Sequence, residues 1–418
     1  MIYFIKNKKV KVVLPFLGVL LGMASSGSNR LLLSVINPDV LTFSFRATDS
    51  GASLLATDSI KVSIDNQVVT TKVATKNGNI TDVTYTRATP FSAGKHTYTI
   101  EVKDTQGNLV TDSGSFIAAQ VATLTSVHQA VSVDKLKPGF VWRIVQNEVM
   151  TSKSLDDAEL ALVGTLKDDT GAVVENLANS GEKSNALAAG VKDGNALKFE
   201  IPTLLNIASF AGNSGGEFTP DEEMPGLPGT SGLDFGIAAD VTTYVEFPAG
   251  VVTLAIACDD SFRAQAGPIS KPVDGVLLGE GIGNLNVNVT PGLTKVFVQD
   301  AGIYPVRILF QDSGGAAYLE FASVKPNGEK VLVNDISNGG LKAYREGVAP
   351  AKSNRVAAGN VPLGLTGTPL SGVTLSEFDK TVSADIPITG TSGFLTITPS
   401  VSIISIKNEG GKLLIQYR

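Results

Sequence analysis

The sequence predicts an all-β protein of tandem β-sandwiches, with a short helical or loop insertion and a β-rich C-terminal segment. Short runs such as LTFSFRA, HTYTIEVKD and VVTLAIAC alternate apolar with polar residues, which is the period of a strand. Turn-forming residues such as Asp65-Asn66 separate these runs. The chain has 418 residues and is 43% apolar, which is too long for one ordinary domain and apolar enough to fold.

The first residues, 1–26, are expected to be a signal peptide. A basic stretch, MIYFIKNKKVK, precedes the apolar run VVLPFLGVLLGM, and small residues follow it. The alternative, a membrane anchor, needs about 20 apolar residues, and this run is shorter. No second run of spanning length follows, so we expect a secreted, extracellular or cell-surface protein without a transmembrane span in the mature chain.

Charge and cysteine content narrow the classes of function. Loss of the four lysines of the signal peptide changes the formal charge from −6 to −10. An acidic surface argues against nucleic acid as a partner, because phosphates require a basic patch, and it suits a divalent cation. Cys258 is the sole cysteine, so no disulfide can form within the chain.

Residues 30–119 are predicted to form the first β-sandwich, with about seven short strands in roughly 90 residues. The stretch FSAGKHTYTIEVKDTQGNLVTDSGSF resembles the immunoglobulin-like modules of large bacterial surface proteins. This resemblance implies an immunoglobulin-like spacer and transfers no functional residues.

Residues 120–345 are predicted to form a second β-sandwich with a loop-rich lead-in. Ser154 followed by Asp157 is typical of a helix start, and Leu155, Leu160 and Leu162 are expected to share one face of that short helix.

Two other features of the lead-in have a structural interpretation. Trp142 is expected to anchor the core or an interface, with sugar stacking as the alternative. Residues 176–236 are rich in Gly, Ser, Asn and Pro, and EFTPDEEMPGLPGTSG within them is predicted to be a loop.

From Asp240 onward the strand pattern is stronger. Alternation places Cys258 on one strand face with other apolar residues, so it is expected to be a small buried side chain, and a reactive thiol is the alternative. The face shared with Cys258 consists of Val252, Leu254 and Ile256.

Residues 346–418 are predicted to be a linker and a partial β-rich segment.

The order EFPAG, VVTLAIACDDSFRAQAG and AGIYPVRILFQDSGGAAYLEF resembles the PA14-type, protective-antigen-like β-sandwich, over about Phe235 to Asp335. The resemblance implies a mostly non-catalytic module, of which several members bind carbohydrate, often through calcium. In those members an aspartate pair lies across a cis peptide bond, and the matching residues here are Asp259 and Asp260.

The resemblance therefore implies a Ca²⁺ site at Asp259 and Asp260. Adjacent side chains on an extended strand point to opposite faces, whereas a cis bond turns both carboxylates to one side. Calcium accepts many oxygen ligands in irregular geometry. Asn284 and Asn286 of GNLNVNV, together with Asp312, are expected to complete the ligand-binding site.

The alternative is a structural turn in which one carboxylate of the pair caps backbone amides and the other is solvated. Arg263 is expected to be a neighbouring ion partner of the pair, which would lower the need for calcium. This interpretation and the calcium site both remain open from the sequence.

An enzyme is not expected. His96 and His128 adjoin no plausible nucleophile, and no GxSxG or HExxH motif occurs. Of the carboxylates that a glycosidase would need, Asp221, Glu222 and Glu223 stand in a proline-rich loop.

The sequence thus predicts a secreted or surface protein that binds a glycan or cell-surface polymer. The alternatives are a structural spacer of a larger extracellular assembly and the accessory region of a polysaccharide-degrading enzyme.

Overall fold

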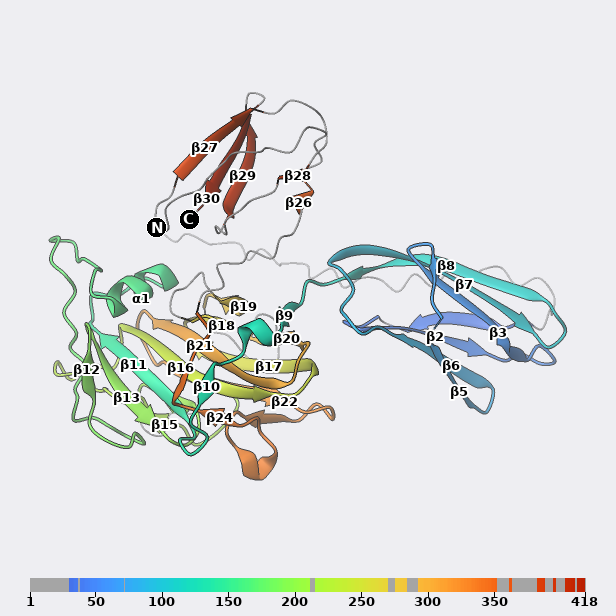
Figure 1. Ribbon diagram of the computed structural model, residues 1–418. Coiled ribbons are helices and arrows are strands. Elements are labelled where there is room, and N and C mark those ends of the chain that lie inside the picture. The colour runs from blue at the N-terminus through green and yellow to red at the C-terminus, as the bar shows by residue number, and fades with distance from the viewer. Residues whose placement is uncertain are drawn as a thin grey trace, which may run out of the picture. The chain divides into compact units, whose positions relative to one another are not determined.

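The computed structural model confirms the all-β fold class, and the chain divides into two compact units, residues 1–120 and 121–418 (Figure 1). The expected signal peptide, residues 1–26, lies outside the described residues. The division of the second unit into a domain ending at residue 345 and a separate segment, 346–418, stays a prediction. The structure describes residues 30–36, 38–70, 72–210, 215–269, 275–283 and 292–351, together with the C-terminal strands β26 (Val361–Pro362), β27 (Val382–Pro387), β28 (Phe394–Leu395), β29 (Ile403–Glu409) and β30 (Lys412–Tyr417).

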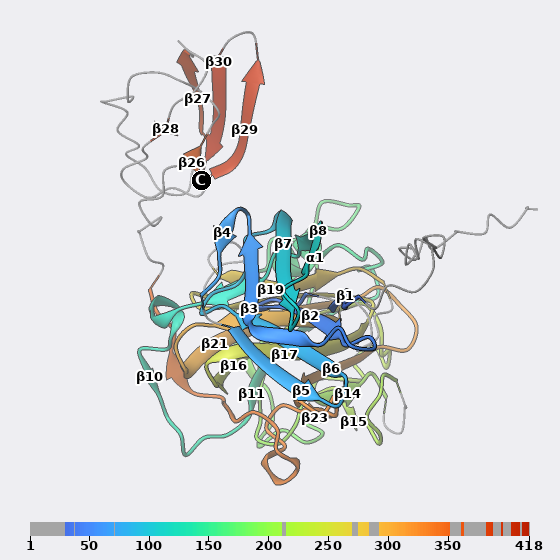
Figure 2. The ribbon, with the colours of Figure 1, turned by 90° about the vertical axis from the view of Figure 1, so that its right-hand side faces the viewer.

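The first unit consists of two four-stranded antiparallel sheets. Inward-facing residues of both sheets, such as Phe43, Phe45 and Ile100, form one core, as the alternating pattern requires. The predicted turn at Asp65-Asn66 joins two strands, and both residues have positive φ. The relation to immunoglobulin-like modules stays a prediction. One sheet contains, in spatial order, β1 (Leu32–Ile36), β2 (Thr42–Thr48), β6 (Ile80–Thr86) and β5 (Lys72–Asn77), and Figure 2 shows β5 beside β6. The other sheet contains β4 (Gln67–Val68), β3 (Leu55–Ile64), β7 (Gly94–Asp104) and β8 (Leu109–Ala118).

The second unit is a larger sandwich of two sheets. The first sheet contains β12 (Val191–Asp193), β13 (Ala196–Ile201), β11 (Phe140–Gln146), β16 (Ile237–Phe247), β21 (Gly302–Asp312), β18 (Ser261–Ala266) and β19 (Val276–Gly281), with β24 (Ala343–Tyr344) beside β16. The second contains β15 (Glu222–Glu223), β14 (Asn206–Ala208), β22 (Tyr318–Val324), β17 (Gly250–Asp259), β20 (Leu293–Val298) and β9 (Ala122–Leu124), with β23 (Lys330–Leu332) beside β22. A separate pair of short strands joins β10 (Ser132–Val133) to β25 (Gly347–Val348).

The core of this unit lies between the two sheets. The predicted shared face of β17 is confirmed, because Leu254, Ile256 and Cys258 are all fully buried in it. Burial raises the pKa of the Cys258 thiol, which keeps it protonated, so the alternative of a reactive thiol is wrong. The opposite face of β17 is buried as well, through Ala255 and Ala257.

Helix α1 (Leu155–Leu162) covers the outer face of the first sheet (Figure 1). Its predicted start is confirmed, because the Ser154 side chain accepts a hydrogen bond from the Asp157 amide at 3.2 Å. Leu155 and Leu162 are buried, but Leu160 is 43% exposed, so the prediction that all three share a face is wrong. Five residues correspond to about 500° of helix rotation, which turns Leu160 away from Leu155.

Residues 176–236 are more regular than predicted. They contribute four strands, and within the expected loop EFTPDEEMPGLPGTSG the short strand β15 pairs in parallel with β14. Trp142 is fully buried, and its indole N–H donates to the Pro225 carbonyl at 2.9 Å, so its core role is confirmed and sugar stacking is excluded.

The C-terminal strands form a three-stranded sheet of β27, β30 and β29 and a pair of β26 with β28. None of the helices in the described ranges has both the length and the apolar content to span a membrane.

Candidate functional site

The aspartate pair marks the point where the chain passes from one sheet to the other. Asp259 ends β17 in the second sheet and pairs with Tyr318, whereas Ser261 begins β18 in the first sheet and pairs with Gln311. A single residue, Asp260, therefore joins strands of different layers, and its amide donates to the Gln311 carbonyl at 3.3 Å. The Asp259–Asp260 peptide bond is cis. Two adjacent carboxylates thus lie where β17 ends and β18 begins.

Asp260 is almost completely buried and is tied to two neighbouring segments. One carboxylate oxygen pairs with the ammonium of Lys153, and the other accepts from the Ser313 amide at 3.1 Å and the Ser313 hydroxyl at 2.6 Å. Burial by itself would raise the pKa of Asp260, but the hydrogen bonds from Lys153 and Ser313 outweigh it and hold the pKa below its usual value. Asp260 is therefore an ionised carboxylate.

Asp312, at the end of β21, is the most deeply buried of the predicted site residues. Its side chain is fully buried, and neither carboxylate oxygen has a hydrogen bond of normal geometry with a described group. Burial, and then the charge of Asp260, raise its pKa to about 7, and the amides of Gly314 and Gly236 offset this only in part. A buried carboxyl without such bonds is costly, so this one requires an explanation.

Lys153 is the cation that the sequence analysis missed. Its ammonium pairs with Asp260, and that hydrogen bond, followed by the charges of Asp260, Asp259 and Asp312, raises its pKa. The side chain is nevertheless 51% exposed. The signal available in the sequence was only its position immediately before the Ser154 helix cap, and this does not identify a partner 107 residues away.

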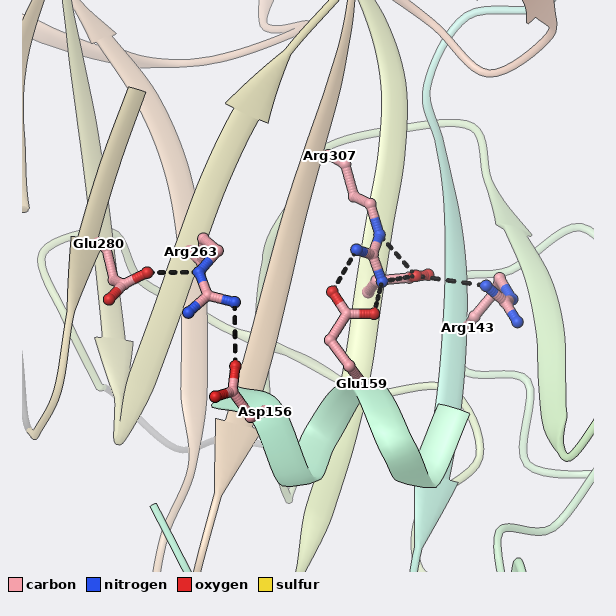
Figure 3. Close-up of polar contacts among 7 residues, drawn as sticks. Arg143, Asp156, Glu159, Arg263, Glu280 and Arg307 are labelled. Atoms are coloured by element: carbon pink, nitrogen blue, oxygen red, sulfur yellow. Dashed lines mark hydrogen bonds and ion pairs between the residues drawn. The ribbon is translucent and has the colours of Figure 1, made fainter. Parts of the chain in front are cut away.

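The prediction that Arg263 is the ion partner of the pair is wrong for Asp260. Arg263 lies opposite Glu280 in the β18–β19 register and forms an ion pair with it (Figure 3). Its second partner is Asp156 of α1, at 3.5 Å. The cross-strand position of Glu280 explains this choice, because directly opposite residues approach each other closely.

A second ion-pair network attaches α1 to the same sheet. Arg307 of β21 donates to Asp240 of β16 at 2.7 and 2.9 Å and to Glu159 of α1 at 2.9 Å (Figure 3). Arg143 adds a 3.3 Å contact to Asp240. Although burial alone would lower the pKa of Arg307, its two carboxylate partners raise it, so the guanidinium stays charged. This network fixes the helix that follows Lys153.

A cavity of 360 Å³ has Gln311, the backbone partner of Asp260, in its wall, and neither aspartate of the pair lines it. It lies between the start of α1, residues 149–152 and residues 166–170, and Gln311 contributes to its wall. Gln311 also donates to the Ser152 carbonyl, while its own side-chain carbonyl is buried and has no hydrogen-bond partner among the described residues. The volume falls in the usual range for small-ligand sites, about 300–1,000 Å³. Polar lining residues include Asp157, Asp168, Asp169 and Thr170.

The structure brings together only part of the predicted site. Asp259, Asp260 and Asp312 lie close enough for their charges to interact. Asn284 and Asn286 lie outside the described residues, so their part in the site stays a prediction.

The carboxylates flagged for glycosidase chemistry are elsewhere in the second unit. Asp221 is buried and accepts from the Gly215 amide at 3.1 Å, and Glu222 and Glu223 form β15. Burial raises the pKa of both Asp221 and Glu223. The absence of an enzymatic activity stays a prediction.

Asp259 and Asp260 supply the hard oxygen donors that Ca²⁺ prefers, and Asp312 is a further carboxyl close to them. Within the described ranges, however, no three Asp, Glu, His or Cys side chains are gathered as a formed metal cage. Asp260 is turned toward Lys153 and Ser313 instead. The donor set fits calcium in its chemistry, on condition that Lys153 gives up its contact.

Comparisons with known proteins identify no family. No family model matches the chain, and no curated protein matches it either. Among solved structures, it is similar to a PA14 sugar-binding domain from an RTX adhesin (15% identity, 50% of this chain and 99% of that one, TM-score 0.27). It is also similar to the Epithelial Adhesin 6 A domain from Candida glabrata, solved in complex with Galb1-3GlcNAc (16% identity, 54% and 97%, TM-score 0.29). A third similar structure is an anti-sigma factor domain-containing protein (9% identity, 73% and 85%, TM-score 0.28).

Proposed function

We propose that the chain is a non-catalytic, secreted or cell-surface protein whose second unit binds a glycan at the aspartate turn with the help of calcium. The single observation that carries this proposal is Asp312. It is a fully buried carboxyl whose two oxygens lack normal hydrogen bonds, next to the ionised Asp260. A cation beside this carboxyl would favour its ionised form and offset the cost of its burial.

Asp259 and Asp260 are the residues that would hold the ion, with Asn284 and Asn286 as further expected ligands. A bound Ca²⁺ would accept vicinal sugar hydroxyls in place of water molecules. The neighbouring cavity, with Gln311 in its wall, offers space and polar groups for the rest of the sugar. Glycans on a cell surface or an extracellular polymer are the partners that this chemistry suits.

A structural role is the second candidate, and one observation favours it. Lys153 and Ser313 already satisfy the Asp260 carboxylate, as expected of a turn that only stabilises the sandwich. In that case the chain would be a spacer of an extracellular assembly or an accessory region of a polysaccharide-degrading enzyme.

A glycan array probed with the full chain, in Ca²⁺ and in EDTA, separates the two candidates. We expect binding in Ca²⁺, loss of binding in EDTA, and loss of binding in Asp259→Asn. Asp156→Asn is the matched control, because it removes one carboxylate that is 84% exposed. The absence of glycan binding under both conditions contradicts the proposal.

Thermal melting gives an independent measurement. If Asp259 holds calcium, Asp259→Asn lowers the melting temperature only when Ca²⁺ is present. Equal destabilisation with and without Ca²⁺ supports the structural role instead.

A further inference from the structure

The backbone at Lys153 is held directly against the aspartate turn. The Ser261 hydroxyl donates to the Lys153 carbonyl at 3.2 Å, and the Gln311 amide group donates to the Ser152 carbonyl. On the other side, Ser154 caps helix α1. Residues of β18 and β21 therefore position the start of the Lys153 side chain, and its ammonium reaches Asp260 as a consequence of the fold.

The Lys153 ammonium lies near three carboxyl groups at the turn and forms its ion pair with one of them. The charges of Asp259, Asp260 and Asp312 all act on it, and it pairs with one oxygen of Asp260. The second oxygen of Asp260 is occupied by Ser313. A divalent ion that uses both aspartates of the pair must therefore take the place of the Lys153 ammonium.

The Lys153 side chain can leave this ion pair more easily than Asp260 can. Its side chain is 51% exposed, whereas the side chain of Asp260 is only 5% exposed. Withdrawal of the ammonium returns it to water and uncovers a carboxylate that cannot move away. The lysine is thus the exchangeable partner and the aspartate the fixed one.

We propose that Lys153 is a built-in competitor of the divalent cation at the Asp259–Asp260 turn, so that calcium binds only when the Lys153 ammonium leaves Asp260. This inference rests on the proposed function, because it assumes the calcium site. It assigns Lys153 a role in setting the affinity and selectivity of that site: an ion must supply enough binding energy to displace an ammonium already in place. The carboxylate contacts keep Lys153 protonated, so deprotonation does not release it at neutral pH.

Calorimetric titration of the full chain with CaCl₂ tests the proposal. The variant Lys153→Met keeps the length of the apolar stem and removes the ammonium. Its matched control is Lys192→Met, at an exposed lysine of β12 that lies outside the cavity lining and forms no ion pair within the described part of the chain. Both variants change the net charge equally, so only the Asp260 contact distinguishes them.

We expect Lys153→Met to bind Ca²⁺ about tenfold more tightly than the wild type. A tenfold change in affinity corresponds to about 1.4 kcal/mol, which is close to the net free energy of one hydrogen bond to a charged group. Lys192→Met should stay within about twofold of the wild type, since exposed charges interact weakly. Melting curves in EDTA verify that all three proteins are folded.

The outcomes separate this inference from the proposed function. Equal Ca²⁺ affinity of the wild type and Lys153→Met overturns the competition and leaves the calcium site intact. An equal gain in Lys153→Met and Lys192→Met also overturns it, because net charge alone would then account for the effect. If none of the three proteins binds Ca²⁺, both the competition and the calcium dependence fail, and the glycan array still decides whether sugar binding occurs.

Discussion

Replacing Glu159 by glutamine should loosen the attachment of α1 to the sandwich. Glu159 and Arg307 form a fork-to-fork ion pair in which the side chains are 16% and 8% exposed (Figure 3). Glutamine keeps one acceptor oxygen and places an amide N–H against the other guanidinium N–H, so one charge-assisted bond is lost. That loss costs about 2 kcal/mol. The larger cost of a fully orphaned charge is avoided, because Asp240 still pairs with Arg307.

The measurement is calorimetric melting of the full chain, followed for the transition of the second unit. For a unit of about 300 residues, about 2 kcal/mol lowers the melting temperature by roughly 3 °C, because the entropy of unfolding grows with chain length. Asp156→Asn is the matched control on the same helix, because its partner contact to Arg263 is 3.5 Å long and 84% of the Asp156 side chain is exposed. It should cost less than about 0.5 kcal/mol. The reasoning is refuted if Asp156→Asn destabilises the second unit as much as Glu159→Gln does.

Two further predictions concern the pH dependence of the first unit and the glycines. The His96 ring Nδ1–H donates to the Asp65 carboxylate at 2.6 Å, and that hydrogen bond raises the pKa of His96 in the folded state. The resulting stabilisation is complete below the unfolded pKa of about 6.5 and is lost as pH rises through the folded pKa. Urea unfolding of the first unit should therefore show falling stability over this window, and Asp65→Asn should remove most of the slope; an unchanged slope in that variant contradicts the assignment. Gly139 and Gly250 have similar φ values, +110° and +107°, but a Cβ at 139 would lie 2.0 Å from the Ile201 carbonyl oxygen, whereas a Cβ at 250 would meet nothing within 4 Å. Gly250→Ala should cost about 1–2 kcal/mol from backbone strain alone, and Gly139→Ala clearly more; equal melting temperatures of the two variants would count against the clash.

Local patterns predicted the elements that local forces determine. The alternation along β17 placed Cys258 on the core face, and Ser154 marked the start of α1, because strand period and helix capping involve only neighbouring residues. The alternating sequence ALKFEI of β13 was missed, since the glycine and asparagine residues around it favoured a loop.

The candidate site was only partly predictable for the opposite reason. The aspartate pair is visible as a doublet, but its partners come from distant segments: Lys153 is 107 residues away and Ser313 is 53 residues away. Arg263 was assigned to the pair on sequence proximity, whereas strand register places it opposite Glu280. Only the assembled sheets determine which charges meet.

The passage of the chain between sheets at Asp260 has a mechanical consequence. Because β17 and β18 lie in different layers and are joined through this one residue, the turn is a short covalent connection between the two sheets. A contact that immobilises Asp260, whether with Ser313, Lys153 or an ion, therefore restrains the movement of one sheet relative to the other. Binding of an ion or ligand at this turn should therefore shift the cooperative unfolding transition of the whole sandwich, and not merely change the order of a surface loop.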